Sequence, residues 1–188
     1  MEQIRIHGRG GQGVVTAAEL IAIAAFYDGK EAQAFPSFGV ERSGAPIQSF
    51  VRISNQPIIT REQIYEPTVL IIQDATLINT TDVFYGANKN TLVIINASEN
   101  NWPDLRKKYP KLFCSPATAI ALKIFGKNIV NTVILGAFAR QTKLVSLASL
   151  KKAIKEKFTA KGADLIAKNI QAVELAYGDK SLSGDKTK

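Results

Sequence analysis

A six-residue turn with four glycines, Gly8-Arg9-Gly10-Gly11-Gln12-Gly13, constrains the fold of this chain more than any other feature. Before it, residues 3–7 alternate polar and apolar side chains, which predicts a β-strand. After it, residues 14–27 are apolar nearly all round, which predicts a buried helix. Glycine tolerates the tight backbone that joins two such elements. The beginning of the chain is therefore expected to form a strand–turn–helix unit of an α/β protein.

Further along, two unbroken apolar runs at residues 69–72 and 92–95 predict strands that are covered on both faces, as in a parallel sheet. Shorter strands are expected at residues 31–35 and 47–53, on either side of an irregular segment at residues 36–46. Asp74 and Asn96 follow the two apolar strands, at the edge of a parallel sheet that faces ligands. Capping of the following loops is the alternative role for both.

Helices are predicted at residues 76–84, 117–125, 130–140, 146–158 and 163–177, the last two amphipathic. Ser115 and Pro116 have the residue types that start a helix, with serine at the cap and proline in the first turn. Together the elements predict an α/β fold: a single doubly wound, mostly parallel sheet flanked by helices, with C-terminal amphipathic helices. We expect one domain over residues 1–178 and a disordered basic tail over residues 179–188.

The glycine turn has the G-x-G-x-x-G spacing, between a strand and a helix, that cradles phosphate groups. The candidate cradle consists of Gly8, Arg9, Gly10, Gly11, Gln12 and Gly13, with Arg9 adding a positive charge to the unpaired N–H groups of the helix start. A dinucleotide site would need an acid about 20 residues on, at the end of the second strand. Glu31 lies at the start of that strand instead. An anion site, a packing turn and a dinucleotide site thus stay open, the last with the least support.

Composition excludes several kinds of site. The 188 residues include one cysteine, Cys114, whereas an iron–sulfur cluster needs about four thiolates. One histidine, His7, cannot build a histidine-rich metal centre or a well-placed catalytic triad. We therefore predict no catalytic residue and no metal ligand in this chain. No signal peptide precedes the first strand and no apolar run approaches ~18 residues, so a cytoplasmic location without membrane contact is expected.

The net charge of +8 is uneven, because residues 143–188 carry 10 lysines against 5 acids. A solvated helix face explains such a run most simply. No aromatic stripe or recognition motif accompanies the lysines, so a nucleic-acid partner is not expected. A surface for an acidic protein partner is the remaining alternative.

A longer pattern surrounds the turn. GRGGQGVVTAAE at residues 8–19 is followed by AQAFPSFGVERSGAP at residues 32–46, then by Tyr65-Glu66-Pro67, Gln73-Asp74, Asn131-Thr132 and Leu135-Gly136-Ala137. This combination resembles the gamma subunit of the 2-oxoacid:ferredoxin oxidoreductases over residues 3–175. The segment FPSFGVERSGAP is similar to the pyruvate type of that family.

The resemblance implies a complex that converts pyruvate, coenzyme A and oxidised ferredoxin to acetyl-CoA, carbon dioxide and reduced ferredoxin, in either direction. It implies alpha, beta and delta-type partner subunits that hold thiamine diphosphate, magnesium and iron–sulfur clusters. The gamma subunit carries no cofactor, supports coenzyme A access, and is inactive alone. The alternatives are a branched-chain 2-oxoacid or 2-oxoglutarate enzyme of the same family, or a free-standing dinucleotide-binding module.

The irregular segment is the second candidate site. Its dense turn formers surround large and charged side chains, which suits a ligand or interface loop. The candidate residues for coenzyme A or a subunit interface are Ser37, Phe38, Glu41, Arg42 and Ser43. Arg42 could bind a phosphate or carboxylate with two parallel hydrogen bonds. The alternative is a surface Glu41–Arg42 pair with Phe38 packed in the core.

Overall fold

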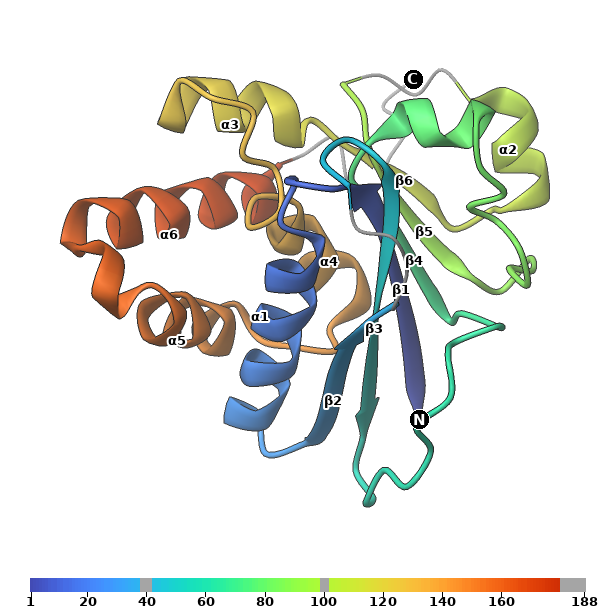
Figure 1. The fold of residues 1–188 in the computed structure, drawn as a ribbon, viewed down its shortest axis with the longest axis horizontal. Coiled ribbons are helices and arrows are strands. Elements are labelled where there is room, and N and C mark those ends of the chain that lie inside the picture. The colour runs from blue at the N-terminus through green and yellow to red at the C-terminus, as the bar shows by residue number, and fades with distance from the viewer. Residues whose placement is uncertain (38–41, 99–101, 180–188) are drawn as a thin grey trace.

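The computed structural model describes residues 1–37, 42–98 and 102–179. In chain order its elements are β1 (Glu2–Arg9), α1 (Val14–Tyr27), β2 (Glu31–Pro36), β3 (Pro46–Ser54), β4 (Val69–Ile72), η1 (Ala75–Asn79), β5 (Leu92–Asn96), α2 (Pro103–Lys108), β6 (Leu112–Ser115), α3 (Ala117–Phe125), α4 (Ile134–Thr142), α5 (Leu147–Lys157), η2 (Thr159–Lys161) and α6 (Ala163–Gly178), as Figure 1 shows.

The strands form one six-stranded sheet in the order β2-β3-β1-β4-β5-β6. β1, β4, β5 and β6 are parallel neighbours, whereas β3 is antiparallel to both β1 and β2. The short connection between β2 and β3 explains the reversal, because a parallel pair needs a crossover of a dozen or more residues. The predicted α/β class with a mostly parallel sheet is confirmed, with an antiparallel edge added.

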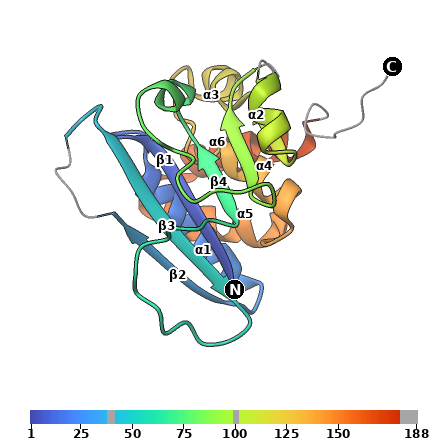
Figure 2. The same cartoon turned by 90° about the vertical axis from the view of Figure 1, so that its right-hand side faces the viewer.

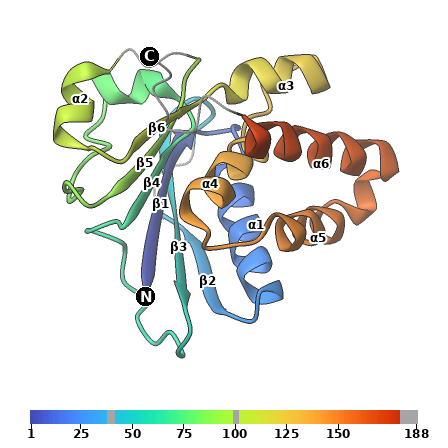
Figure 3. The same ribbon diagram turned by 180° about the vertical axis from the view of Figure 1, so that it is seen from behind.

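The sheet lies between two unequal layers. α1, α3, α4, α5 and α6 cover one face, and η1 and α2 lie on the other (Figures 1 and 3). Alternate residues of the apolar strands divide between them: Ile71 and Ile94 join the core under α1, whereas Leu70 and Ile72 join the core under η1 and α2. These runs are therefore covered on both faces, as expected of parallel strands.

Two buried arginines hold the long β3–β4 connection over the other half of that second face, which Figure 2 views. Arg5 donates to the carbonyls of Ile64 at 3.3 Å and Val83 at 3.1 Å. Arg52 donates to the carbonyl of Glu62, and its guanidinium lies 5.1 Å from the centre of the Phe35 ring. These charged donors satisfy the carbonyls of the irregular segments before β4 and after η1.

His7 is packed at the end of β1 with 2% of its surface exposed. Burial, and then the charge of Arg5, lower its pKa to about 3, so the imidazole is neutral and accepts a hydrogen bond from Arg5 Nε at 3.1 Å. His7 therefore belongs to the arginine network of the β3–β4 connection.

Several predicted boundaries are wrong. Only η1 forms within residues 76–84, because Thr80, Thr81 and Asp82 favour turns over helix. Ser115 ends β6, and Pro116 occupies the N-cap position of α3 without a side-chain hydrogen bond. Residues 131–133 form turns before α4 begins. The helix predicted at residues 146–158 is confirmed as α5, with the Ser146 hydroxyl accepting from Ser149 N at 3.1 Å. α2 and β6 were not predicted.

Candidate functional site

The glycine turn leaves the carboxyl end of β1 and enters α1 beside a second turn at residues 42–46. Two backbone hydrogen bonds join the turns: Gly10 N donates to Ala45 O at 2.9 Å, and Gly44 N donates to Gly10 O at 3.0 Å. The two segments therefore behave as one backbone unit, although a helix and a strand separate them in the sequence.

Packing explains why two of the glycines are required. A Cβ atom on Gly10 would lie 2.2 Å from the carbonyl oxygen of Arg42, which is backbone and cannot rotate away. Gly13 has a φ of 67° at the N-cap of α1, a left-handed conformation that disfavours other residues. Gly11 also has a positive φ, of 92°, which disfavours other residues, but a Cβ there would meet nothing within 4 Å. The turn thus combines tight internal packing with an open outer side.

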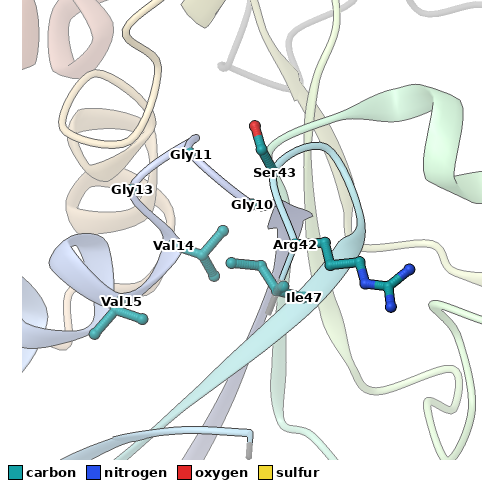
Figure 4. A pocket seen from close by; sticks show the side chains of 8 residues that line it. All are labelled: Gly10, Gly11, Gly13, Val14, Val15, Arg42, Ser43 and Ile47. Carbon is teal, nitrogen blue, oxygen red and sulfur yellow. The ribbon is translucent and has the colours of Figure 1, made fainter. Parts of the chain in front are cut away.

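A hollow of about 470 Å³ opens on that outer side. Its lining residues come from the glycine turn, the first turn of α1 and the start of β3 (Figure 4): Gly10, Gly11, Gly13, Val14, Val15, Arg42, Ser43 and Ile47. Val14 and Ile47 face each other, whereas the Arg42 guanidinium points away from this apolar pair. The hollow has an apolar wall, a glycine backbone, and a cation at its rim.

Hydrogen-bond donors are available along the backbone of the hollow. Within the described residues, no protein acceptor takes the N–H groups of Gly11, Gly13, Val14 or Val15. α1 has no acid in its first turn and no side-chain cap. Such a helix start favours an anion or a carbonyl oxygen, because its free N–H groups carry partial positive charge.

Arg9 is directed elsewhere. Its Nε lies 3.0 Å from Asp74 Oδ2, its Nη2 donates to Thr76 Oγ1 at 2.8 Å, and its Nη1 donates to Gly44 O at 3.1 Å. The charge of Arg9 is thus compensated by Asp74, and all three of its donor groups have protein partners. Its predicted role as a ligand cation stays a prediction, whereas its role in joining three segments is visible.

The structure brings together only part of the predicted loop site. Arg42 and Ser43 line the hollow beside Gly10, Gly11 and Gly13. Ser37 N donates to Gln48 O at 3.0 Å and anchors the loop to β3 outside the lining. Phe38 and Glu41 lie outside the described residues. The Arg42 side chain is exposed and has no hydrogen-bond or ion-pair partner within the described chain, so its guanidinium is available to a ligand at the rim of the hollow.

The remaining cradle residues face inward. A Cβ atom on Gly8 would lie 2.5 Å from Val14 Cγ2. The Gln12 side chain accepts from Arg9 N at 2.8 Å and donates to Asp74 Oδ2 at 3.1 Å. Sequence reasoning missed the apolar wall of Val14, Val15 and Ile47, since nothing in a one-dimensional pattern distinguishes these side chains from core residues.

In the part of the chain that the structure describes, no group of three or more His, Cys, Asp or Glu side chains could hold a metal ion. Cys114 is buried, and its burial raises the thiol pKa despite the nearby charge of Arg106. Within the same residues, no helix is long and apolar enough to cross a membrane.

The fold and the site define an α/β protein whose glycine turn lines a hollow at the start of a helix, and comparison with known proteins identifies its family. Residues 3–178 match the family described as pyruvate ferredoxin/flavodoxin oxidoreductase, and the chain belongs to that family. The pyruvate synthase subunit PorC of Methanocaldococcus jannaschii is 51% identical over 95% of this chain and 97% of its own length. The prediction of a pyruvate-type gamma subunit is confirmed, and the free-standing dinucleotide module is set aside.

Two solved structures share this fold, and the first also supports the assignment. The match to the pyruvate oxidoreductase subunit PORC of Thermotoga maritima covers 94% of each chain at 33% identity, with a TM-score of 0.79. A 2-oxoglutarate:ferredoxin oxidoreductase from Magnetococcus marinus, described with 2-oxoglutarate, coenzyme A and succinyl-CoA bound, has a TM-score of 0.75 at 23% identity. The match covers 93% of this chain and 30% of the Magnetococcus marinus chain. Because the identity is only 23%, this second likeness shows the fold alone.

Proposed function

We propose that this subunit lines the path by which coenzyme A reaches the active site of a pyruvate:ferredoxin oxidoreductase. The hollow beside the glycine turn carries the proposal, because it joins free backbone donors to an apolar wall and an exposed arginine. Coenzyme A has matching parts: anionic phosphates at one end and a slim arm of methylenes and amides at the other. The Magnetococcus marinus enzyme of similar fold was solved with coenzyme A bound, which supports this choice of ligand.

The proposal assigns the redox and decarboxylation chemistry to partner chains. Cys114 alone does not fit an iron–sulfur cluster, which takes about four thiolates. Within the described residues, no group of three or more His, Cys, Asp or Glu side chains could hold a metal ion. Thiamine diphosphate, magnesium and the clusters therefore belong to alpha, beta and delta-type subunits, which also recognise the 2-oxoacid. Ferredoxin docks through the complex, and the complex works in the cytoplasm.

Arg42→Ala is expected to raise the KM for coenzyme A about 10-fold, which corresponds to ~1.4 kcal/mol of lost contact. Arg42 is the lining residue with a full positive charge, and its guanidinium lies at the rim, where a phosphate would remain solvated. Pyruvate-dependent release of carbon dioxide without coenzyme A should be nearly unaffected. Steady-state kinetics of the assembled complex would measure both.

Arg61→Ala provides the matched control, because Arg61 is also exposed but lies in the β3–β4 connection and does not line the hollow. It should leave the KM for coenzyme A unchanged. If Arg42 instead holds a subunit interface, size-exclusion chromatography of its variant would show lost assembly, and all partial reactions would fall together. An assembled Arg42→Ala complex with a normal KM for coenzyme A would refute the ligand role.

A further inference from the structure

Asp74 joins the glycine turn to the segment that follows β4. Its Oδ2 accepts from Arg9 Nε at 3.0 Å and from Gln12 Nε2 at 3.1 Å. Its Oδ1 accepts from Thr76 N at 3.0 Å and from Thr76 Oγ1 at 2.6 Å. A carboxylate with four donors is fully engaged, and its side chain is only 16% exposed.

These interactions keep Asp74 ionised. Burial alone would raise its pKa, but the hydrogen bonds from Thr76 and Gln12 and the charge of Arg9 outweigh burial, so the pKa lies below the ordinary aspartate value. The carboxylate is therefore charged throughout the neutral range. Asp74 itself is absent from the lining of the hollow, so it acts on that site through other residues.

The two side chains bound to Asp74 continue the network toward the hollow. Arg9 Nη1 donates to Gly44 O at 3.1 Å, at the tip of the turn that carries Arg42 and Ser43. Gln12 Oε1 accepts from Arg9 N at 2.8 Å and fixes the middle of the glycine turn. The two backbone bonds between Gly10 and residues 44–45 complete the link. One carboxylate, two residues after β4, is thereby linked through Arg9 and Gln12 to both turns that line the hollow.

We propose that Asp74 is the positioning residue of the coenzyme A path: through Arg9 and Gln12 it fixes the turn at residues 42–46 against the glycine turn. This inference rests on the proposed function, since it assumes that coenzyme A uses the hollow. The inference gives a role to a residue that lies outside the lining of the hollow. It also gives a function to the Arg9–Asp74 ion pair.

Asp74→Asn in the assembled complex tests the proposal. The amide can still accept from Thr76 N, but it loses the charge and turns an NH₂ group toward Arg9 or Thr76. The KM for coenzyme A is expected to rise about five-fold, with kcat at saturation changed less than two-fold. Hydrogen exchange should accelerate in peptides covering residues 8–13 and 42–47. Asp164→Asn, which breaks the exposed Asp164–Lys168 pair of α6, is the matched control and should change neither measurement.

Combining Asp74→Asn with Arg9→Gln gives an additional readout. If both act through one ion pair, the KM of the double variant should rise by less than the product of the two single effects. Unchanged hydrogen exchange, or independent effects, would overturn the positioning role and leave the proposed function intact. Faster exchange in an assembled variant with a normal KM for coenzyme A would mean that coenzyme A does not use the hollow. That result would overturn the proposed function and, with it, this inference.

Discussion

The purified chain without its partners is expected to show no turnover of pyruvate. The single cysteine cannot hold an iron–sulfur cluster, which takes about four thiolates, so the chain alone has no cluster to accept electrons. The assay would contain pyruvate, coenzyme A, thiamine diphosphate, magnesium and a viologen acceptor. The expected rate is zero within detection, a larger effect than any single substitution in the hollow can produce.

Addition of the alpha, beta and delta-type chains to the same preparation should restore activity, which shows that the chain was folded. A complex assembled without this chain is the complementary control. Sustained viologen reduction by the purified chain alone would contradict the division of labour between subunits.

Gly136→Val is expected to lower the free energy of unfolding by about 4 kcal/mol, at the upper end of single-residue effects. Gly136 lies in α4 where that helix crosses α6, and the two lie side by side in Figure 3. A Cβ atom there would lie 2.2 Å from Val173 O and 2.8 Å from Tyr177 N. Both atoms are helix backbone, so relief requires the two helices to separate.

Gly136→Ala separates the steric effect from helix propensity. Alanine favours a helix over glycine by ~1 kcal/mol, so the variant should lose only about 2 kcal/mol net. Gly178→Val is the matched control, because a Cβ on Gly178 meets nothing within 4 Å, and its effect should stay within about 0.5 kcal/mol. Chemical denaturation of each purified chain gives these values. An unfolding free energy of Gly136→Val equal to that of the unsubstituted chain would show that the close α4–α6 contact is incorrect.

The sequence predicted three of the four parallel strands, β1, β4 and β5, because their signals are local, whereas β6 was missed. The apolar runs at β4 and β5 and the glycine turn between β1 and α1 each specify an element without reference to distant residues. The antiparallel placement of β2 and β3 was not predicted, since it depends on the spatial path of their short connection. The helix expected at residues 76–84 is shorter in the structure: Asp74 caps η1, but the turn-forming residues Thr80, Thr81 and Asp82 end it after Asn79.

In the candidate site, too, local features could be predicted from the sequence, whereas contacts between distant residues could not. The glycine turn was found from its spacing, but the partner of Arg9 is 65 residues away in sequence and could not be inferred from it. The proximity of Arg42 and Gly10 likewise depends on backbone bonds between two turns. Glycine at position 10 was expected to admit a ligand, whereas the structure also gives an internal reason, the carbonyl of Arg42.

The central claim is that coenzyme A occupies the hollow between the glycine turn and residues 42–47. Hydrogen exchange of the assembled complex, with and without saturating coenzyme A, tests it most directly. The account predicts slower exchange in peptides covering residues 8–15 and 42–47, because the free N–H groups of Gly11, Gly13 and Val14 acquire an acceptor. Peptides from α5 on the helical face should be unchanged. Protection confined to partner chains, in a complex that turns over normally, would contradict the claim.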